Sequence, residues 1–203
     1  MLESVPASRR IQRHLSLVTG APAAALKSFA LRRFYPFVAG LERFSGRDVL
    51  EIGGTDRISL EHFFTSTGAR YANVRLERNE TKNPRIIEGD FMDVGGKFDL
   101  VISLGVFEPG ALDIDFSAGK ALRSSHTDLE RAQKLFSLVN AGGFAVIGTI
   151  NAPCVFDGAL IRRAGFGILS RESPFYTFMF PDNAGIYAKG DRSELIILKK
   201  KDK

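Results

Sequence analysis

Residues with the chemistry to bind a polar ligand occur where short apolar runs of the sequence end. The first run, VLEI, contains Glu51 and leads into the pair Gly53 and Gly54. Glycine permits positive φ and lets a ligand approach the backbone closely, and the helix expected over residues 59–67 would offer unbonded N–H groups. Taken alone, the glycine pair also suits a tight strand-to-helix turn that binds nothing.

Two further acids follow the next apolar runs. Glu77 directly follows the run YANVRL. A carboxylate in this position can accept two hydrogen bonds from a ribose diol, although Glu77 could equally be a solvated loop acid. Asp90 precedes Phe91, which places an acceptor for an exocyclic amine beside a ring that can cover a planar base. The fourth run, FDLVISL, ends at Leu104 and is followed by Glu108. Each position is ambiguous alone, but their common placement favours one ligand site.

Seven short apolar runs predict the strands that must position these residues. They cover residues 48–52, 71–76, 86–87, 98–104, 144–150, 165–170 and 194–198. Between the fourth and fifth runs, Thr127 and Glu130 predict the capping box of a helix over residues 127–141. The glycine pair Gly142–Gly143 is expected to end that helix.

Strands that alternate with helices indicate an α/β fold, and continuously apolar strands indicate a mostly parallel sheet covered on both faces. In such a sheet, ligands bind beyond the carboxyl ends of the strands, near the point where the strand order reverses. The candidate residues all come at or just after such ends. We therefore expect them to gather along one edge of the sheet.

The composition is that of a globular protein, with 203 residues, 44% hydrophobic residues and a formal charge of +5. The one cysteine, Cys154, cannot form an intramolecular disulfide, which favours a cytoplasmic location. No apolar run reaches the ~18 residues of a membrane span, and arginines interrupt any secretory signal. Four lysines are expected to form a solvated tail: Lys199, Lys200, Lys201 and Lys203.

The chain divides into two parts of different pattern. Residues 1–46 are predicted to form an N-terminal helical extension, because apolar residues recur at helical spacing there, and residues 47–203 form one α/β domain. Within the domain, the long segment Pro109–Ser125 could act as a lid. The aromatic segment Pro174–Gly190 could form a wall of the site, although core packing also explains its rings.

From about Asp48 to Lys199 the chain resembles the class I S-adenosylmethionine-dependent methyltransferases. The segment VLEIGG is similar to the first motif of that family, with Glu51 as its acid and Gly53 as its first glycine. The segment ending at Glu77 resembles the ribose-binding motif, and IIEGDFMDV resembles the segment that contacts adenine. The fourth motif of the family resembles the segment FDLVISLGVFE. Its fifth strand, together with the preceding helix, resembles LVNAGGFAVIGTI, and its closing antiparallel hairpin resembles AGFGIL and SELIILKK.

The resemblance implies a Rossmann-like sheet of seven strands with an antiparallel last strand, and S-adenosylmethionine as the cofactor. It assigns cofactor binding to Glu51, Gly53, Gly54, Glu77, Asp90, Phe91 and Leu104. Glu51 would order the glycine turn and reach toward the methionine part of the cofactor. The chain departs from the family at Thr55 and Arg57, which stand where the second and third glycines are usual, and its connection 77–86 is too short for the usual helix.

The resemblance also implies methyl transfer, for which a small-molecule acceptor is the first expectation. A hydroxyl or amine acceptor can require a general base. Glu108 and His126 are the candidate catalytic residues, with Asn151 a third. Glu108 could instead be a structural acid, and His126 a solvated loop residue.

Two other functions stay open at this point. The same fold could serve as a binding module without catalysis, because the glycine loop is irregular, or the protein could methylate RNA or protein by drawing on its basic charge. Beyond that charge, the sequence does not indicate a nucleic-acid partner, and no Cys/His cluster indicates a metal. It does not fix the oligomeric state.

Overall fold

The computed structural model of the protein describes residues 45–54, 60–66, 68–76, 78–109, 114–115, 120–121, 126–149, 152–172 and 194–200. Several expectations fall outside these ranges. They are the helical extension up to residue 44, the departures from the family at Thr55 and Arg57, the ribose-binding role of Glu77, most of the lid expected over residues 109–125, the candidate Asn151, the aromatic wall over residues 174–190, and Lys201 and Lys203 of the expected tail.

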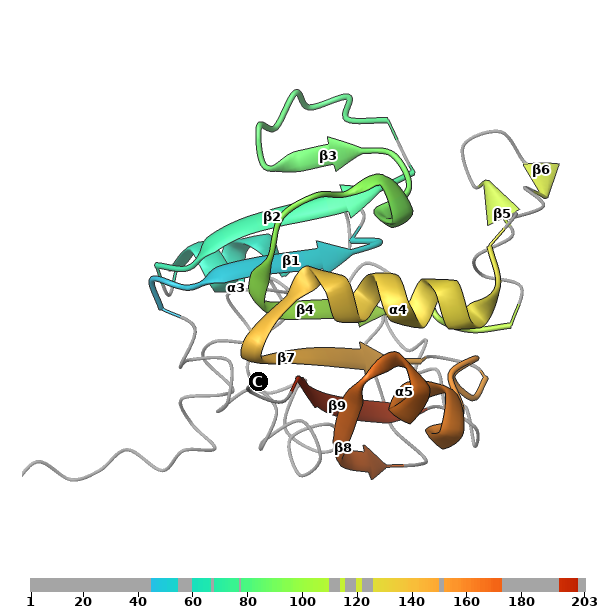
Figure 1. Ribbon diagram of the computed structural model, residues 1–203. Coiled ribbons are helices and arrows are strands. Elements are labelled where there is room, and N and C mark those ends of the chain that lie inside the picture. The colour runs from blue at the N-terminus through green and yellow to red at the C-terminus, as the bar shows by residue number, and fades with distance from the viewer. Residues whose placement is uncertain are drawn as a thin grey trace, which may run out of the picture.

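A seven-stranded sheet forms the centre of the described structure, with the strand order β3-β2-β1-β4-β7-β9-β8 (Figure 1). Its strands are β1 (Asp48–Ile52), β2 (Arg70–Arg75), β3 (Ile86–Glu88), β4 (Phe98–Leu104), β7 (Val139–Gly148), β8 (Phe166–Glu172) and β9 (Leu195–Lys200). β9 pairs antiparallel with both β7 and β8, and the remaining neighbours pair in parallel. The expected α/β sheet of seven strands with an antiparallel last strand is confirmed.

Helices lie on both faces of this sheet (Figure 1). α4 (Asp128–Leu138) and α5 (Gly158–Ala164) cross one face, and the short helix α3 (Glu61–Ser66) lies on the other. The capping box predicted for α4 is present, because Thr127 Oγ1 accepts from Glu130 N while the Glu130 carboxylate accepts from Thr127 N. Three shorter elements complete the described chain: the 3₁₀ helix η2 (Phe91–Asp93) and the antiparallel pair β5 (Ile114–Asp115) and β6 (Lys120–Ala121).

The main hydrophobic core lies between the sheet and the helices α4 and α5. Alternate residues of the central strands supply it, such as Leu50, Val101 and Ile147, none of which exposes any surface. Leu135 of α4 and Ile161 of α5 belong to the same cluster. The intervening residues Val49, Leu100 and Ile102 lie on the opposite face of the sheet and are buried as well, which explains why β1 and β4 are largely apolar without alternation.

The end of α4 differs from the sequence-based prediction. The helix was expected to continue to residue 141 and stop at the glycine pair, but it ends at Leu138 and β7 begins at Val139. Val139 is extended and pairs with Phe98 of β4, so the glycine pair Gly142–Gly143 lies inside the strand. Pairing of a β-branched residue with the sheet thus outweighs the local helical pattern.

The predicted solvated lysine tail is also wrong for Lys199 and Lys200, which belong to β9. Lys200 is only 9% exposed, and its Nζ donates to the carbonyl oxygens of Phe136 and Val139, both at 2.8 Å. The same Nζ lies 4.0 Å from the centre of the Phe136 ring. The last carbonyl groups of a helix have no intrahelical partners and form the negative end of its dipole, so a buried ammonium is stabilised there.

Candidate functional site

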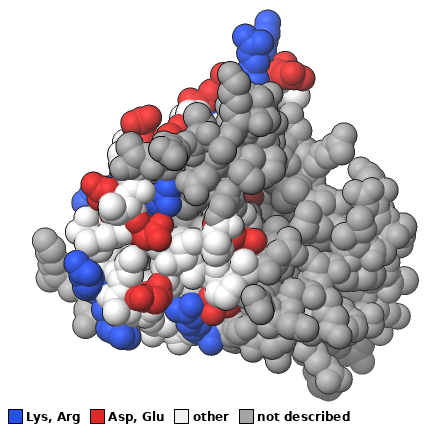
Figure 2. All heavy atoms as spheres, turned by 90° about the vertical axis from the view of Figure 1, so that its right-hand side faces the viewer, with Lys and Arg blue, Asp and Glu red and all other residues white. Residues whose placement is uncertain are grey.

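Those candidate ligand residues that the structure describes lie along one edge of the sheet. We call this the carboxyl edge, and it consists of the residues that follow β1, β2, β3, β4 and β7. These strands all point toward the right-hand side in Figure 1, and Figure 2 shows the molecule from that side. Over the part of that surface that the structure describes, acidic and basic side chains are interspersed (Figure 2).

The glycine turn after β1 is held by the neighbouring strands. Gly53 has a φ of 83°, and its N–H donates to the Val74 carbonyl at 2.8 Å. A Cβ atom at this position would lie 2.2 Å from Val106 Cγ2, in the segment that follows β4. Both the backbone angle and the contact with Val106 therefore require glycine here. The N–H of Gly53 already forms a hydrogen bond within the protein, so any ligand contact at this residue would involve its other atoms.

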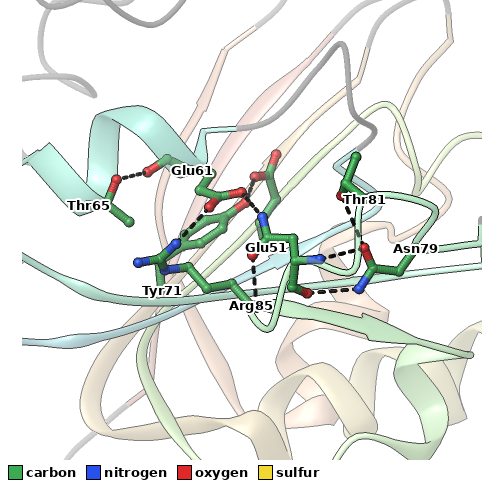
Figure 3. Close-up of polar contacts among 8 residues, drawn as sticks. Glu51, Glu61, Thr65, Tyr71, Asn79, Thr81 and Arg85 are labelled. Carbon is green, nitrogen blue, oxygen red and sulfur yellow. Dashed lines mark hydrogen bonds and ion pairs between the residues drawn. The ribbon is translucent and has the colours of Figure 1, made fainter.

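Glu51 is a buried acid at the end of β1, with 1% of its surface exposed. Its Oε2 accepts a hydrogen bond from the hydroxyl of Tyr71 (Figure 3). The same oxygen accepts a second hydrogen bond, at 2.9 Å, from the backbone N–H of Leu60. Leu60 directly precedes α3, so this carboxylate joins β1, β2 and the start of the following helix. These contacts fit the predicted role of Glu51 in ordering the turn, and its reach toward the cofactor stays a prediction.

The connection between β2 and β3 contains no helix in residues 78–85, as its length led us to expect, and it is docked onto α3 (Figure 3). Asn83 Nδ2 donates to Glu61 Oε2 at 2.7 Å, and Arg85 forms an ion pair with Glu61 Oε1 at 3.2 Å. Asn79 links the turn internally, because its side chain accepts from Asn83 N and from Thr81 Oγ1. The network fixes the segment that follows β2 against the helix that follows β1.

The acid and the aromatic residue after β3 have different surroundings. Asp90 is half-buried and caps η2, with its Oδ1 accepting from Met92 N at 2.9 Å. A carboxylate has further acceptor sites, so this bond is compatible with a ligand contact. Phe91 is only 5% exposed, and its ring packs edge-on against Phe107 with a centroid separation of 5.5 Å. The burial of Phe91 shows a core role that the sequence pattern did not indicate, and its contact with adenine stays a prediction.

The residues after β4 are fixed by packing. Leu104 is the last residue of β4 and reaches the carboxyl edge as expected. Phe107 is fully buried between Phe91 and Phe156, and its carbonyl accepts from Val155 N at 3.0 Å. Glu108 follows it and is 8% exposed. The candidate base therefore lies at the carboxyl edge but largely below the surface.

A second polar cluster, which the sequence did not predict, holds the segment after β7. Glu194 precedes β9 and forms a two-point ion pair with Arg171, with N–O distances of 3.1 and 2.8 Å. The Glu194 carboxylate also accepts from Cys154 N at 2.8 Å, and its backbone exchanges hydrogen bonds with Thr149. Burial raises the pKa of the Cys154 thiol to about 12. Cys154 is therefore a packed thiol with little nucleophilic character.

His126 is half-buried and directly precedes the N-cap residue of α4. The N-terminal end of α4 lies at the carboxyl edge (Figure 1). The backbone and side chain of Thr127 hold the pKa of the Glu130 carboxyl below its usual value, and His126 adds a smaller electrostatic effect in the same direction. The structure thus brings His126 and Glu108 to the same edge of the sheet. Whether either acts as a base stays a prediction.

Two further features of the described residues bear on the class of protein. None of their helices has the length and apolar composition needed to cross a membrane. No group of three or more His, Cys, Asp or Glu side chains among them is arranged to hold a metal ion.

Comparison with known proteins shows the fold. No family model matches the sequence, and no curated protein matches it significantly. Among solved structures, TehB from Haemophilus influenzae superimposes with a TM-score of 0.55 at 16% identity, over 82% of this chain and 62% of TehB. A methyltransferase from Mesorhizobium loti that depends on S-adenosylmethionine gives 0.52 at 13% identity, over 82% and 97% of the two chains.

A third similar structure is 1,6-didemethyltoxoflavin-N1-methyltransferase from Burkholderia thailandensis, with bound 1,6-didemethyltoxoflavin and S-adenosylhomocysteine. It gives a TM-score of 0.52 at 16% identity, over 100% of this chain and 93% of that one. Together with the strand order and the antiparallel β9, these similarities show that the chain has the fold of the class I S-adenosylmethionine-dependent methyltransferases.

Proposed function

We propose that the protein is a methyltransferase that uses S-adenosylmethionine to methylate a small molecule. The observation that carries the proposal is the carboxyl edge of a sheet with the methyltransferase fold, where Glu51 lies near the end of β1, the glycine turn follows β1 and Asp90 follows β3. The similar structures share less than 20% sequence identity with this chain and therefore support the fold alone. The proposed activity rests on the residues of the carboxyl edge.

The cofactor would lie across the ends of β1, β2, β3 and β4. Glu51 with Gly53 and Gly54 would face its methionine part, and Glu77 would accept hydrogen bonds from the ribose hydroxyls. Asp90 would accept from the adenine amine. Phe91 and Leu104 would contact the adenine ring. Phe91 would do so through the edge of its ring, because that ring is packed in the core.

Bound S-adenosylmethionine supplies an electrophilic methyl group on a sulfonium sulfur. The protein has to align the acceptor atom with that group and exclude water, a proximity effect worth several kcal/mol, roughly 7–11 in the best-oriented cases. An amine or hydroxyl acceptor loses one proton on methylation. Glu108 or His126 would take that proton, since both lie at the carboxyl edge.

A small-molecule acceptor is supported by one of the similar structures. The structure of the Burkholderia enzyme contains bound 1,6-didemethyltoxoflavin and S-adenosylhomocysteine, and the present chain spans 93% of that protein. The described part of the carboxyl edge has mixed charge, whereas a nucleic-acid substrate would favour a continuous basic surface (Figure 2).

Calorimetry with S-adenosylhomocysteine tests the cofactor claim without a known acceptor. We expect saturable binding to the wild type, and a loss of roughly tenfold or more for Glu77→Ala, because lost hydrogen bonds of this kind cost about 1–3 kcal/mol. Asp90→Ala should weaken binding less, because packing of the base remains. Asp93→Ala is the matched control, since Asp93 is an exposed acid in the same 3₁₀ helix.

No binding by a folded wild-type sample at millimolar ligand would overturn the proposal and favour a binding module that has lost the cofactor. Equal effects of Asp90→Ala and Asp93→Ala would remove the assignment of Asp90. Once an acceptor is known, Ala at Glu108 or His126 should lower turnover much more than cofactor affinity if that residue is the base.

A further inference from the structure

The side-chain amide of Asn73, in β2, forms two hydrogen bonds with the backbone of Gly54. The N–H of Gly54 donates to Asn73 Oδ1 at 3.2 Å, and Asn73 Nδ2 donates to the carbonyl of Gly54 at 2.6 Å. Asn73 is 1% exposed, so both bonds are shielded from water. One residue of β2 therefore holds both polar backbone groups of the second glycine in the turn after β1. We call this pair of bonds the Asn73 clamp.

The chemistry of the Asn73 clamp is specific to asparagine. The amide presents one donor and one acceptor on adjacent atoms, and only one of its two orientations satisfies both the N–H and the carbonyl of Gly54. Aspartate keeps the acceptor but would place an oxygen against the Gly54 carbonyl. Leucine has a similar shape and would leave both backbone groups without their present partner.

The clamp is packed into the same unit as Glu51. The register of the sheet pairs Glu51 of β1 with Asn73 of β2, so the two side chains lie next to each other on one face. A Cβ atom on Gly54 would lie 2.7 Å from Glu51 Cδ and 2.9 Å from Asn73 Nδ2. The turn therefore packs directly against the buried side chains of Glu51 and Asn73, which fix its position.

We infer that Asn73 is a positioning residue for the cofactor site, an inference that rests on the proposed function. The glycine turn is the part of the site that would meet the methionine end of S-adenosylmethionine. By occupying both polar groups of Gly54, the clamp fixes the turn before the ligand arrives. A turn that is fixed in advance lowers the entropy cost of ordering it on binding. Release of the clamp should therefore lower the affinity for the cofactor without removing any atom that contacts it.

Amide exchange tests the clamp itself, independently of any ligand. In a sample labelled with ¹⁵N-glycine, the Gly54 amide should be protected in the wild type. Gly68 provides an internal reference, because its N–H donates to the Thr65 carbonyl at 3.1 Å and does not involve Asn73. Asn73→Leu and Asn73→Asp should raise the exchange rate of Gly54 about tenfold or more, as expected for the loss of a buried hydrogen bond, and leave that of Gly68 unchanged.

Calorimetry with S-adenosylhomocysteine then tests the consequence for binding, on variants shown to be folded by circular dichroism. Asn73→Leu and Asn73→Asp should each bind about tenfold more weakly or worse. Asn140→Leu is the matched control. Asn140 Nδ2 donates to Asp99 Oδ1 at 3.0 Å and joins β7 to β4 at the opposite edge of the sheet. Its loss should lower the thermal midpoint while leaving the affinity within about twofold, because distant sites act independently.

The outcomes separate this inference from the proposed function. If the wild type does not bind, the proposed function fails and the inference falls with it. If the wild type binds and both Asn73 variants bind equally well, the inference alone is wrong and Asn73 is a stability residue. An unprotected Gly54 amide in the wild type would overturn the clamp even if Asn73→Leu does not fold. Protection of Gly54, weaker binding by the Asn73 variants and unchanged binding by Asn140→Leu would establish it.

Discussion

Replacing Gly53 with alanine probes the turn on which the candidate site depends. Gly53 has a φ of 83°, where an L-residue costs about 1–2 kcal/mol. The new Cβ atom would also lie 2.2 Å from Val106 Cγ2, and overpacking of this kind typically costs about 1–3 kcal/mol. We therefore expect Gly53→Ala to lower the free energy of unfolding by about 2–5 kcal/mol.

A second substitution separates the two costs. Val106→Ala removes Cγ2, and the next nearest atom to the new Cβ is Val106 Cβ at 3.6 Å, an ordinary contact distance. In that background, Gly53→Ala should cost only the backbone strain of about 1–2 kcal/mol. The coupling energy between the two positions should therefore be about 1–3 kcal/mol, with the double variant more stable than additivity predicts.

Equilibrium unfolding in urea, followed by circular dichroism, measures all four free energies of this cycle. The m-value has to stay constant across the variants for the comparison to hold. Equal costs of Gly53→Ala in the two backgrounds would refute the proposed contact with Val106. A cost below about 0.5 kcal/mol in the wild-type background, as for an ordinary surface change, would refute the strained geometry as well.

Three further measurements test other parts of the structure. Lys200→Met should lower the free energy of unfolding by about 1–3 kcal/mol in the same urea assay, because it removes a buried charged donor from the end of α4. Lys199→Met, on the neighbouring residue of β9, should cost much less. Cys154 should react with a thiol reagent at pH 8 only as the protein unfolds, since with a pKa of about 12 only about one thiol in 10⁴ is ionised; rapid labelling of the native protein would contradict this. Hydrogen bonding to Arg70 lowers the pKa of Asp48, so this pair stabilises the fold above the unfolded-state pKa and loses that contribution as the pH falls through the lower folded-state value. The stability difference between the wild type and Asp48→Asn should therefore shrink from pH 6 to pH 3, and a constant difference would show that the pair contributes no such linkage.

Much of the fold could be predicted from the sequence because its strands are local apolar runs. The bounds of β1 and β4 agree with the predicted ranges residue for residue, and the capping box of α4 identifies its first residue. The antiparallel direction of β9 followed from the family resemblance, whereas the order of the strands was not predicted, since periodicity gives no strand order. The helix α5 was not predicted, because its seven residues are too few to show a helical pattern.

The contacts that build the site could be predicted only in part. The placement of Glu51, Asp90 and Leu104 at strand ends follows from where each run stops. The role of Asn73 depends on which residues of β1 and β2 lie opposite one another, and the sequence does not fix that register. The role of Val106 depends on how the segment after β4 packs against the glycine turn, which the sequence does not fix either. The one available signal was a polar residue inside the apolar run YANVRL, because a buried amide has to find hydrogen-bond partners.

The place of β9 in the sheet has a consequence for how the protein is made. β9 lies between β7 and β8 and pairs with both, yet it is synthesised after every other strand of the sheet, and residues 173–194 separate it from β8. Until it leaves the ribosome, β7 and β8 have no partner between them, and the apolar surface that Ile196 and Leu198 later cover stays open. A nascent chain in this state exposes two unpaired strand edges and cannot complete its core. The sheet and its core are therefore expected to be completed only when β9 inserts between β7 and β8.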